Sequence, residues 1–168
     1  LFPYTTLCRS CEDSVQKGMA LRAAADVSFR QGKALAAIDL YREAEQHLTD
    51  ATELLKVYAS WAILADEHGI PDHTSYLIQQ LCALLANYEE TDSAAIYGYL
   101  ALARMYVRSN RLDDAVAAAQ EAVRLADAVG LAQAEAYSAL SKVHEACDRL
   151  PEAMEALEHA MLHMGEGH

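Results

Sequence analysis

Apolar residues recur three and four positions apart along most of this chain, with polar residues between them. This is the period of an α-helix with one buried face, and no segment shows the strict alternation typical of a strand. Gly and Pro residues fall mostly between the periodic stretches, as helix-ending residues do. The pattern predicts eight helices, at 14–31, 34–49, 52–68, 73–87, 92–108, 112–128, 132–147 and 151–163.

Small residues recur seven positions apart in the second helix of three predicted helix pairs. They are Ala37 and Ala44, Ala115 and Ala122, and Ala153 and Ala160. The first members of these pairs are separated by 78 and then 38 residues, or two periods of 39 and one of 38. A fixed period of this size, with helical patterning throughout, is typical of helical hairpins stacked into an array.

Small residues at facing positions let two helix backbones approach closely, so the alanine pairs predict tight crossings within the hairpins. The second hairpin departs from this pattern, because Thr74 and Leu81 occupy the two positions. We therefore expect a looser or shifted packing of its helices.

The third copy resembles the tetratricopeptide repeat (TPR), a hairpin of two helices with characteristic large and small positions. The matching residues are Tyr99, Leu102, Ala103, Tyr106, Leu112, Ala115 and Ala122. The fourth copy, from Tyr137 to Ala160, resembles it equally, the first less and the second least. The resemblance implies an all-α, right-handed helical-hairpin solenoid of about four repeats and about eight antiparallel helices. The repeats would span about 18–51, 55–88, 96–129 and 134–167, and the alternative is an ordinary helical bundle.

The first ten residues, LFPYTTLCRS, resemble a translated DNA-sequencing adapter, LFPYTTLFRS, at nine of ten positions. We therefore expect residues 1–10 to be an artefact outside the fold, and residues 11–168 to form the array as a fragment of a longer protein. Because Cys8 lies in the adapter-like segment, Cys8 and Cys11 do not make a metal or redox motif. The alternative is a genuine N-terminus or signal peptide, which would need a basic stretch followed by an apolar one.

The chain is acidic, with a net charge of −12, which argues against binding to nucleic acid or to an anionic membrane. No uninterrupted apolar run approaches the roughly 18 residues that would cross a bilayer. The four cysteines are too few and too scattered for a disulfide framework. These features predict a cytoplasmic protein, since thiols stay reduced there.

No catalytic constellation is visible, because phosphate-binding loops, HExxH and GxSxG are all missing from the sequence. We therefore expect neither an enzyme nor a cofactor. His159 and His163 lie four residues apart on one helix face with Glu155, a spacing that can hold zinc. No Cys lies at tight spacing to them, so they are weak metal candidates, and a solvated helix face is the simpler interpretation.

In the TPR family, the first helix of each repeat lines the concave surface of the array. We transfer the family's groove positions onto the first helix of each repeat in this chain. The resemblance then implies a partner-binding groove with contact residues Arg22, Arg30, Lys56, Tyr97, Leu100, Arg104, Arg108 and Lys142. The 20 groove positions carry a net charge of +1, whereas the rest of the chain after residue 10 carries −14. These positions are Met19, Arg22, Asp26, Phe29, Arg30, Lys56, Ala59, Ile63, Asp66, Glu67, Tyr97, Leu100, Arg104, Val107, Arg108, Glu135, Ser138, Lys142, Glu145 and Ala146. We therefore expect an acidic or mixed amphipathic segment as partner. The alternative is that some arginines merely pair with acidic residues of the neighbouring repeat.

The expected function is that of a protein–protein interaction module, which binds a peptide or partner domain in its groove. The groove lacks the asparagines of the chaperone-tail carboxylate clamp, so a chaperone C-terminus is not implied. The alternative is a regulatory or sensory segment of a larger bacterial signalling protein, because the last repeat is similar to those that accompany diguanylate cyclase domains or helix-turn-helix regulators. Met161, Leu162 and Met164 in the final segment also predict self-association through the last repeat.

Overall fold

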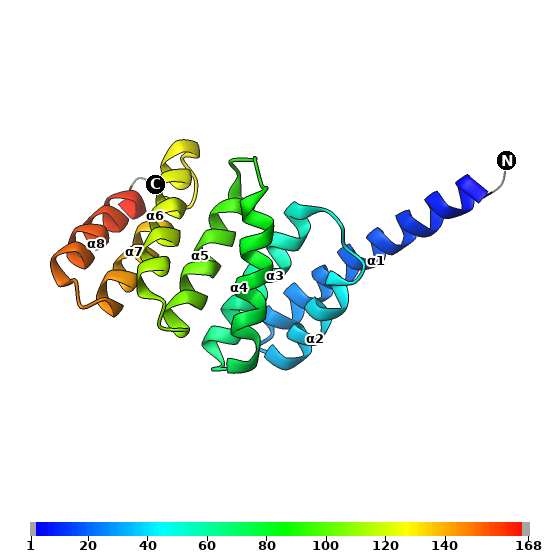
Figure 1. Cartoon of the computed structure of the whole chain (residues 1–168), viewed down its shortest axis with the longest axis horizontal. Coiled ribbons are helices and arrows are strands. Elements are labelled where there is room, and N and C mark those ends of the chain that lie inside the picture. The colour runs from blue at the N-terminus through cyan, green and yellow to red at the C-terminus, as the bar shows by residue number, and fades with distance from the viewer. Residues whose placement is uncertain (1–2, 166–168) are drawn as a thin grey trace.

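The computed structural model describes the backbone of residues 3–165 and the side chains of residues 10–70 and 72–165. This part of the chain is all-α. Its helices are α1 (Pro3–Arg30), α2 (Ala34–Glu45), α3 (Ala51–Glu67), α4 (Thr74–Ala86), α5 (Ser93–Arg108), α6 (Leu112–Val129), α7 (Gln133–Ala146) and α8 (Leu150–Gly165), with a 3₁₀ turn, η1 (Pro71–His73), before α4. Figure 1 shows an elongated array that runs from α1 at one end to α8 at the other. The predicted all-α fold is confirmed.

Within the described residues, consecutive helices pair into four hairpins: α1–α2, α3–α4, α5–α6 and α7–α8. In the first, third and fourth hairpins the two backbones lie closely together, and the alanines predicted at the crossings are at most 3% exposed. The backbones of α3 and α4 approach over a shorter stretch, and α3 instead lies along α5. Leu81 and Thr74 are buried, and their side chains hold the backbones farther apart than alanine would. The wider separation of these two backbones agrees with the looser or shifted packing predicted for the second hairpin.

Two helix ends differ from the predicted ones by more than two residues. α1 begins at Pro3, eleven residues earlier than predicted, and its first half projects beyond the other helices (Figure 1). α2 ends at Glu45, four residues earlier than predicted. The α-helical bonds give way there to tighter ones, in which the backbone N–H of Gln46 donates to the carbonyl of Glu43 at 3.2 Å. After this turn Asp50 adopts an extended conformation, and its side chain accepts a hydrogen bond from the backbone N–H of Glu53 at 2.9 Å. Asp50 thereby caps α3.

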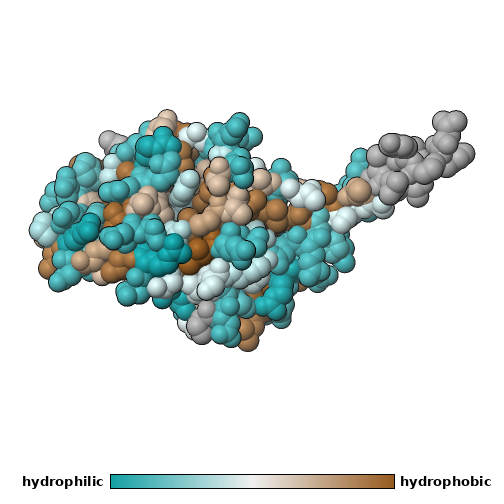
Figure 2. All heavy atoms as spheres, in the orientation of Figure 1, coloured by the Kyte–Doolittle hydropathy of each residue, from teal (hydrophilic) through white to brown (hydrophobic). Residues whose placement is uncertain are grey.

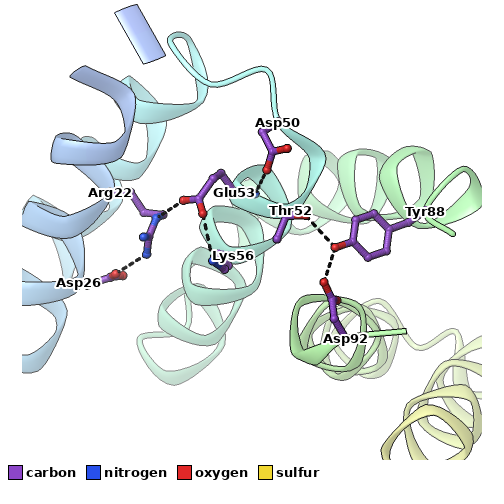
Figure 3. A network of polar contacts seen from close by, with 8 residues as sticks. All are labelled: Arg22, Asp26, Asp50, Thr52, Glu53, Lys56, Tyr88 and Asp92. Atoms are coloured by element: carbon purple, nitrogen blue, oxygen red, sulfur yellow. Dashed lines mark hydrogen bonds and ion pairs between the residues drawn. The ribbon is translucent and has the colours of Figure 1, made fainter. Parts of the chain in front are cut away.

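Arg22 ties the first hairpin to the second (Figure 3). Its guanidinium lies 2.9 Å from the Asp26 carboxylate in α1 and 2.8 Å from the Glu53 carboxylate in α3. Lys56 also donates to Glu53, at 3.0 Å. Burial raises the pKa of Glu53, but the hydrogen bond from Lys56 and the charge of Arg22 outweigh it and hold this pKa below its ordinary value.

Asp92 caps α5 by accepting a hydrogen bond from the backbone N–H of Ala95 at 3.0 Å. Its second oxygen accepts from the Tyr88 hydroxyl at 2.7 Å, and this hydroxyl also contacts Thr52 of α3 at 2.8 Å (Figure 3). Burial and the Asp92 carboxylate raise the pKa of Tyr88 to about 12, although the contact with Thr52 lowers it. Tyr88 therefore remains a hydrogen-bond donor at neutral pH.

Trp61 of α3 has the largest fully buried side chain among the described residues, with 1% of it exposed. Its ring lies 6.3 Å from that of Tyr58 and 5.8 Å from that of Tyr76, between ring centroids. Its indole N–H donates to Nδ1 of His73 at 3.1 Å, while the Arg42 guanidinium lies 2.9 Å from Nε2 of the same histidine. Tyr58 and Trp61 are thus core residues of the second hairpin.

Acidification should destabilise the array through His73. Burial first, and then the charge of Arg42, lower the pKa of His73 below its ordinary value, and Asp72 offsets them only in part. The folded state therefore binds the proton less well than the unfolded state. The stability that neutral His73 contributes is fully present above the unfolded pKa of about 6.5 and is lost as the pH falls below it.

Urea unfolding checks this expectation. Between about pH 7.5 and 5.5 the wild type should lose more stability than His73→Asn, whose amide oxygen can still accept from Trp61. Between about pH 7.5 and 8.5 the two proteins should show the same change, because histidine is neutral in both the folded and the unfolded state there. An equal loss on acidification in the two proteins would contradict this role of His73.

Candidate functional site

A hollow lies between α3, α5 and α7, the first helices of the last three hairpins. Its volume is about 450 Å³, which is in the range of ligand-binding pockets. It is lined by Ile63, Asp66, Tyr97, Leu100, Ala101, Ala103, Arg104, Val107, Glu135, Ser138, Ala139, Lys142 and Val143. Nine of these 13 residues belong to the 20 positions that the repeat register assigned to a groove. The stacking of equivalent helices thus brings residues from three repeats to one surface.

The hollow combines buried apolar residues with partly exposed polar ones. Leu100 is only 8% exposed, whereas Tyr97, one turn earlier in α5, is 41% exposed. Burial, and then the negative charge of Glu135, raise the pKa of Tyr97. Its hydroxyl therefore stays protonated at neutral pH and is available to donate a hydrogen bond. Such a surface suits a segment that carries both apolar and polar side chains.

Asp66 of α3 holds two arginines of α5 at the edge of the hollow. Its carboxylate oxygens lie 3.3 Å from Nη1 of Arg104 and 3.2 Å from Nη1 of Arg108, and Arg108 also donates to the Asp66 backbone carbonyl at 3.1 Å. For these two arginines the structure supports the alternative interpretation, in which they pair with the neighbouring repeat. Arg104 nevertheless lines the hollow, while Arg108 does not.

Three further cations that the register assigned to the groove lie outside the hollow. Arg22 and Lys56 are engaged with Glu53, so they hold the first two hairpins together. Arg30 donates to the backbone carbonyl of Asp26 at 3.3 Å. The structure therefore brings together Tyr97, Leu100, Arg104 and Lys142 from the expected contact set, and separates the others from them.

Lys142 and Glu135 of α7 are the charged lining residues whose side chains form no ion pair or hydrogen bond within the part of the chain that the structure describes. Asp66 and Arg104, by contrast, form an ion pair with each other. The hollow therefore offers an incoming segment one cation and one anion, together with its apolar lining. This matches a segment of mixed charge.

Register reasoning missed some lining residues and the role of Asp66. Ala101 and Ala139 lie one helical turn after groove positions Tyr97 and Glu135, so helical periodicity within each helix would have found them. The signal for Asp66 was the presence of arginines 38 and 42 residues later, about one repeat away.

The weak metal candidates His159 and His163 both stack on Tyr137 of α7. Their ring centroids lie 4.9 Å and 5.6 Å from that of the tyrosine, with nearly parallel planes. The Tyr137 hydroxyl donates to Asp127 at 2.8 Å. Among the described residues, no three or more His, Cys, Asp or Glu side chains gather where they could hold a metal ion. The spacing of four residues thus serves ring packing between α7 and α8.

No family model matches the sequence, and no curated protein sequence matches it. Among solved structures, the chain is similar to the crystal structure of a Rap protein complexed with competence and sporulation factor, with a TM-score of 0.74 and 16% sequence identity. The alignment covers 99% of this chain and 49% of that protein, so this chain spans about half of its length. At this identity the likeness shows the fold, which is a TPR-like helical repeat array. Within residues 3–165, no helix is both long enough and apolar enough to cross a membrane.

Proposed function

We propose that this chain is a non-enzymatic protein-interaction module, and that its hollow binds a peptide segment of mixed, partly acidic character. The observation that carries the proposal is the convergence of α3, α5 and α7 on one surface, where a buried apolar lining meets the unpaired charges of Lys142 and Glu135. The Rap protein of the same fold is complexed with a factor, which supports a binding role for the array.

The partner follows from the chemistry of the hollow. An apolar side chain of the segment would lie over Leu100 and Val107, where it excludes water. An acidic residue would approach Lys142, and a basic residue would approach Glu135. The exposed ring of Tyr97 would supply contact area and a hydroxyl donor, as tyrosines often do in binding hot spots.

Selection of a random peptide display library on the intact chain tests the proposal. We expect selected peptides to combine apolar residues with at least one acidic residue. Tyr97→Ala and Lys142→Glu should each weaken their binding about tenfold or more, measured by fluorescence anisotropy. Both side chains are solvent-accessible at the hollow, so unfolding midpoints should stay close to the wild-type value.

Lys17→Glu is the matched control for charge reversal, because Lys17 has a half-exposed side chain on α1, away from the hollow. Tyr97→Phe separates the contribution of the ring from that of the hydroxyl. If the selected peptides bound Tyr97→Ala and Lys142→Glu as tightly as the wild type, the proposed site would be wrong.

The signalling alternative remains a second proposal, favoured by one observation: the Rap protein has about twice the length of this chain. In that case the array would control a further domain of the same polypeptide. The neighbouring reading frame tests this directly, since it would encode a catalytic or DNA-binding domain in phase with the array. A reading frame that encodes neither would count against it.

A further inference from the structure

The last helix, α8, exposes a continuous apolar stripe. We call this stripe the end face; it consists of Leu150, Met154, Leu157, Met161 and Met164. Each of these side chains is 46–64% exposed, and their spacing of four and three residues places them on one side of the helix. Figure 2 shows apolar residues among hydrophilic ones at the α8 end of the array. So many exposed large apolar side chains on one helix mark an interaction surface.

Equivalent positions in the other hairpins show what such a face normally does. We align the hairpins on Ala37, Thr74, Ala115 and Ala153. The counterparts of Leu157 are then Tyr41, Ile78 and Ala119, and those of Met164 are Leu48, Leu85 and Ala126. All six are at most 9% exposed, whereas Leu157 is 46% and Met164 61% exposed. In α2, α4 and α6 this face is covered by the first helix of the following hairpin. In the other hairpins, the face equivalent to the end face is therefore covered by the next helix of the array.

The opposite end carries the matching surface. We call Ala20 and Val27 of α1 the start face; both are exposed, Val27 by 46%. Their counterparts are Val57, Gly98 and Ala136 for Ala20, and Leu64, Met105 and Val143 for Val27. All six are buried. In the second, third and fourth hairpins, the surface equivalent to the start face thus packs against the preceding hairpin.

Charge favours contact between these two ends over contact between two copies of the same end. α8 contains Glu152, Glu155 and Glu158 and no Lys or Arg, whereas residues 11–30 of α1 contain three Lys or Arg and three Asp or Glu. A symmetric pair of α8 helices would bring six glutamates together. An α8–α1 contact instead joins a helix of net charge −3 to a segment whose charges balance, so it avoids this repulsion.

We propose that the chain associates head to tail with a second copy of itself, with the end face of one copy packed on the start face of the next as α6 packs on α7. Because the two surfaces differ, this contact is heterologous and leaves one of each free in a dimer. A single pair of helix faces is small for an interface, so the association is weak and has to be measured at high concentration.

Sedimentation velocity on the whole chain, from about 10 to 500 µM, tests this proposal. The wild type should show a weight-average mass that rises with concentration above 18.4 kDa. Val27→Glu blocks the start face and Leu157→Glu blocks the end face, so each variant alone should remain monomeric. An equimolar mixture should recover a dimer, because each variant keeps the surface that the other has lost.

Leu35→Glu is the control. Leu35 is 71% exposed, but its counterparts are the exposed Asp72, Asp113 and Pro151, so it lies on neither face. This variant should associate like the wild type. Circular dichroism of each variant would show that the fold is intact. Unchanged binding of the peptides selected on the hollow would show that the hollow is intact. The head-to-tail proposal and the proposed peptide site are therefore tested by different measurements.

Two results would overturn the head-to-tail proposal. A wild type that stays monomeric over the whole range would show that a second copy does not cover these faces. Dimers of Val27→Glu alone would show that α8 pairs with α8.

Discussion

Replacing Trp61 by alanine should lower the free energy of unfolding by about 3–5 kcal/mol, the largest effect we expect from a single substitution. The indole is 1% exposed and lies against rings from both α3 and α4. Its loss would leave a cavity at the hairpin whose backbones are least in contact, and would remove the donor to Nδ1 of His73. Since domains of this size are stable by only about 5–15 kcal/mol, the variant should approach unfolding.

Urea denaturation followed by circular dichroism measures this effect. Trp61→Phe is the matched control, because it keeps a large ring and removes the indole N–H; it should cost clearly less than the alanine variant. If Trp61→Ala were destabilised by less than about 1 kcal/mol, the indole would not be the anchor of this hairpin.

The residue size at the helix crossings predicts a second large effect on stability. At two equivalent positions the destabilising change is opposite: a smaller residue in one hairpin and a larger residue in the other. Leu81 and Ala122 occupy the same place in the second and third hairpins, and both are 0% exposed. Leu81→Ala should cost about 2–5 kcal/mol because it leaves a cavity between helices that stand apart. Ala122→Leu should cost about 1–3 kcal/mol because it forces a larger side chain between helices that already touch.

Thermal and urea unfolding of the two variants would measure both changes. Ala117→Leu is the control, because Ala117 lies on the exposed side of α6 and should tolerate leucine within about 0.5 kcal/mol. Tolerance of leucine at position 122 would mean that the small residue does not set the distance between α5 and α6.

The eight helices were predictable from the sequence because each buries one face against its neighbours, which imposes the helical period on the apolar residues. The register of the alanines also fixed which helix faces point to a common side. For this reason nine of the residues that line the hollow, among them Tyr97, Leu100 and Lys142, could be named in advance.

The pairing of charges was not predictable in the same way. Register places Arg108 and Asp66 on one side of the array, but whether their side chains meet depends on how far α3 and α5 stand from each other. That distance is set by packing, and here α3 lies along α5 more closely than along its own partner α4. The same limit applies to His159, whose stacking on Tyr137 depends on the crossing of α7 and α8.

The close packing of α3 along α5 also has a mechanical consequence. A stacked array bends most easily where neighbouring backbones touch least, which in this chain is where α3 meets α2 and α4. α3 and α5, which carry Ile63 and Tyr97, should then move as one rigid body while the array bends elsewhere. Tension or twist applied at either end would change the curvature of the whole molecule. The distance between α3 and α5 would stay almost constant.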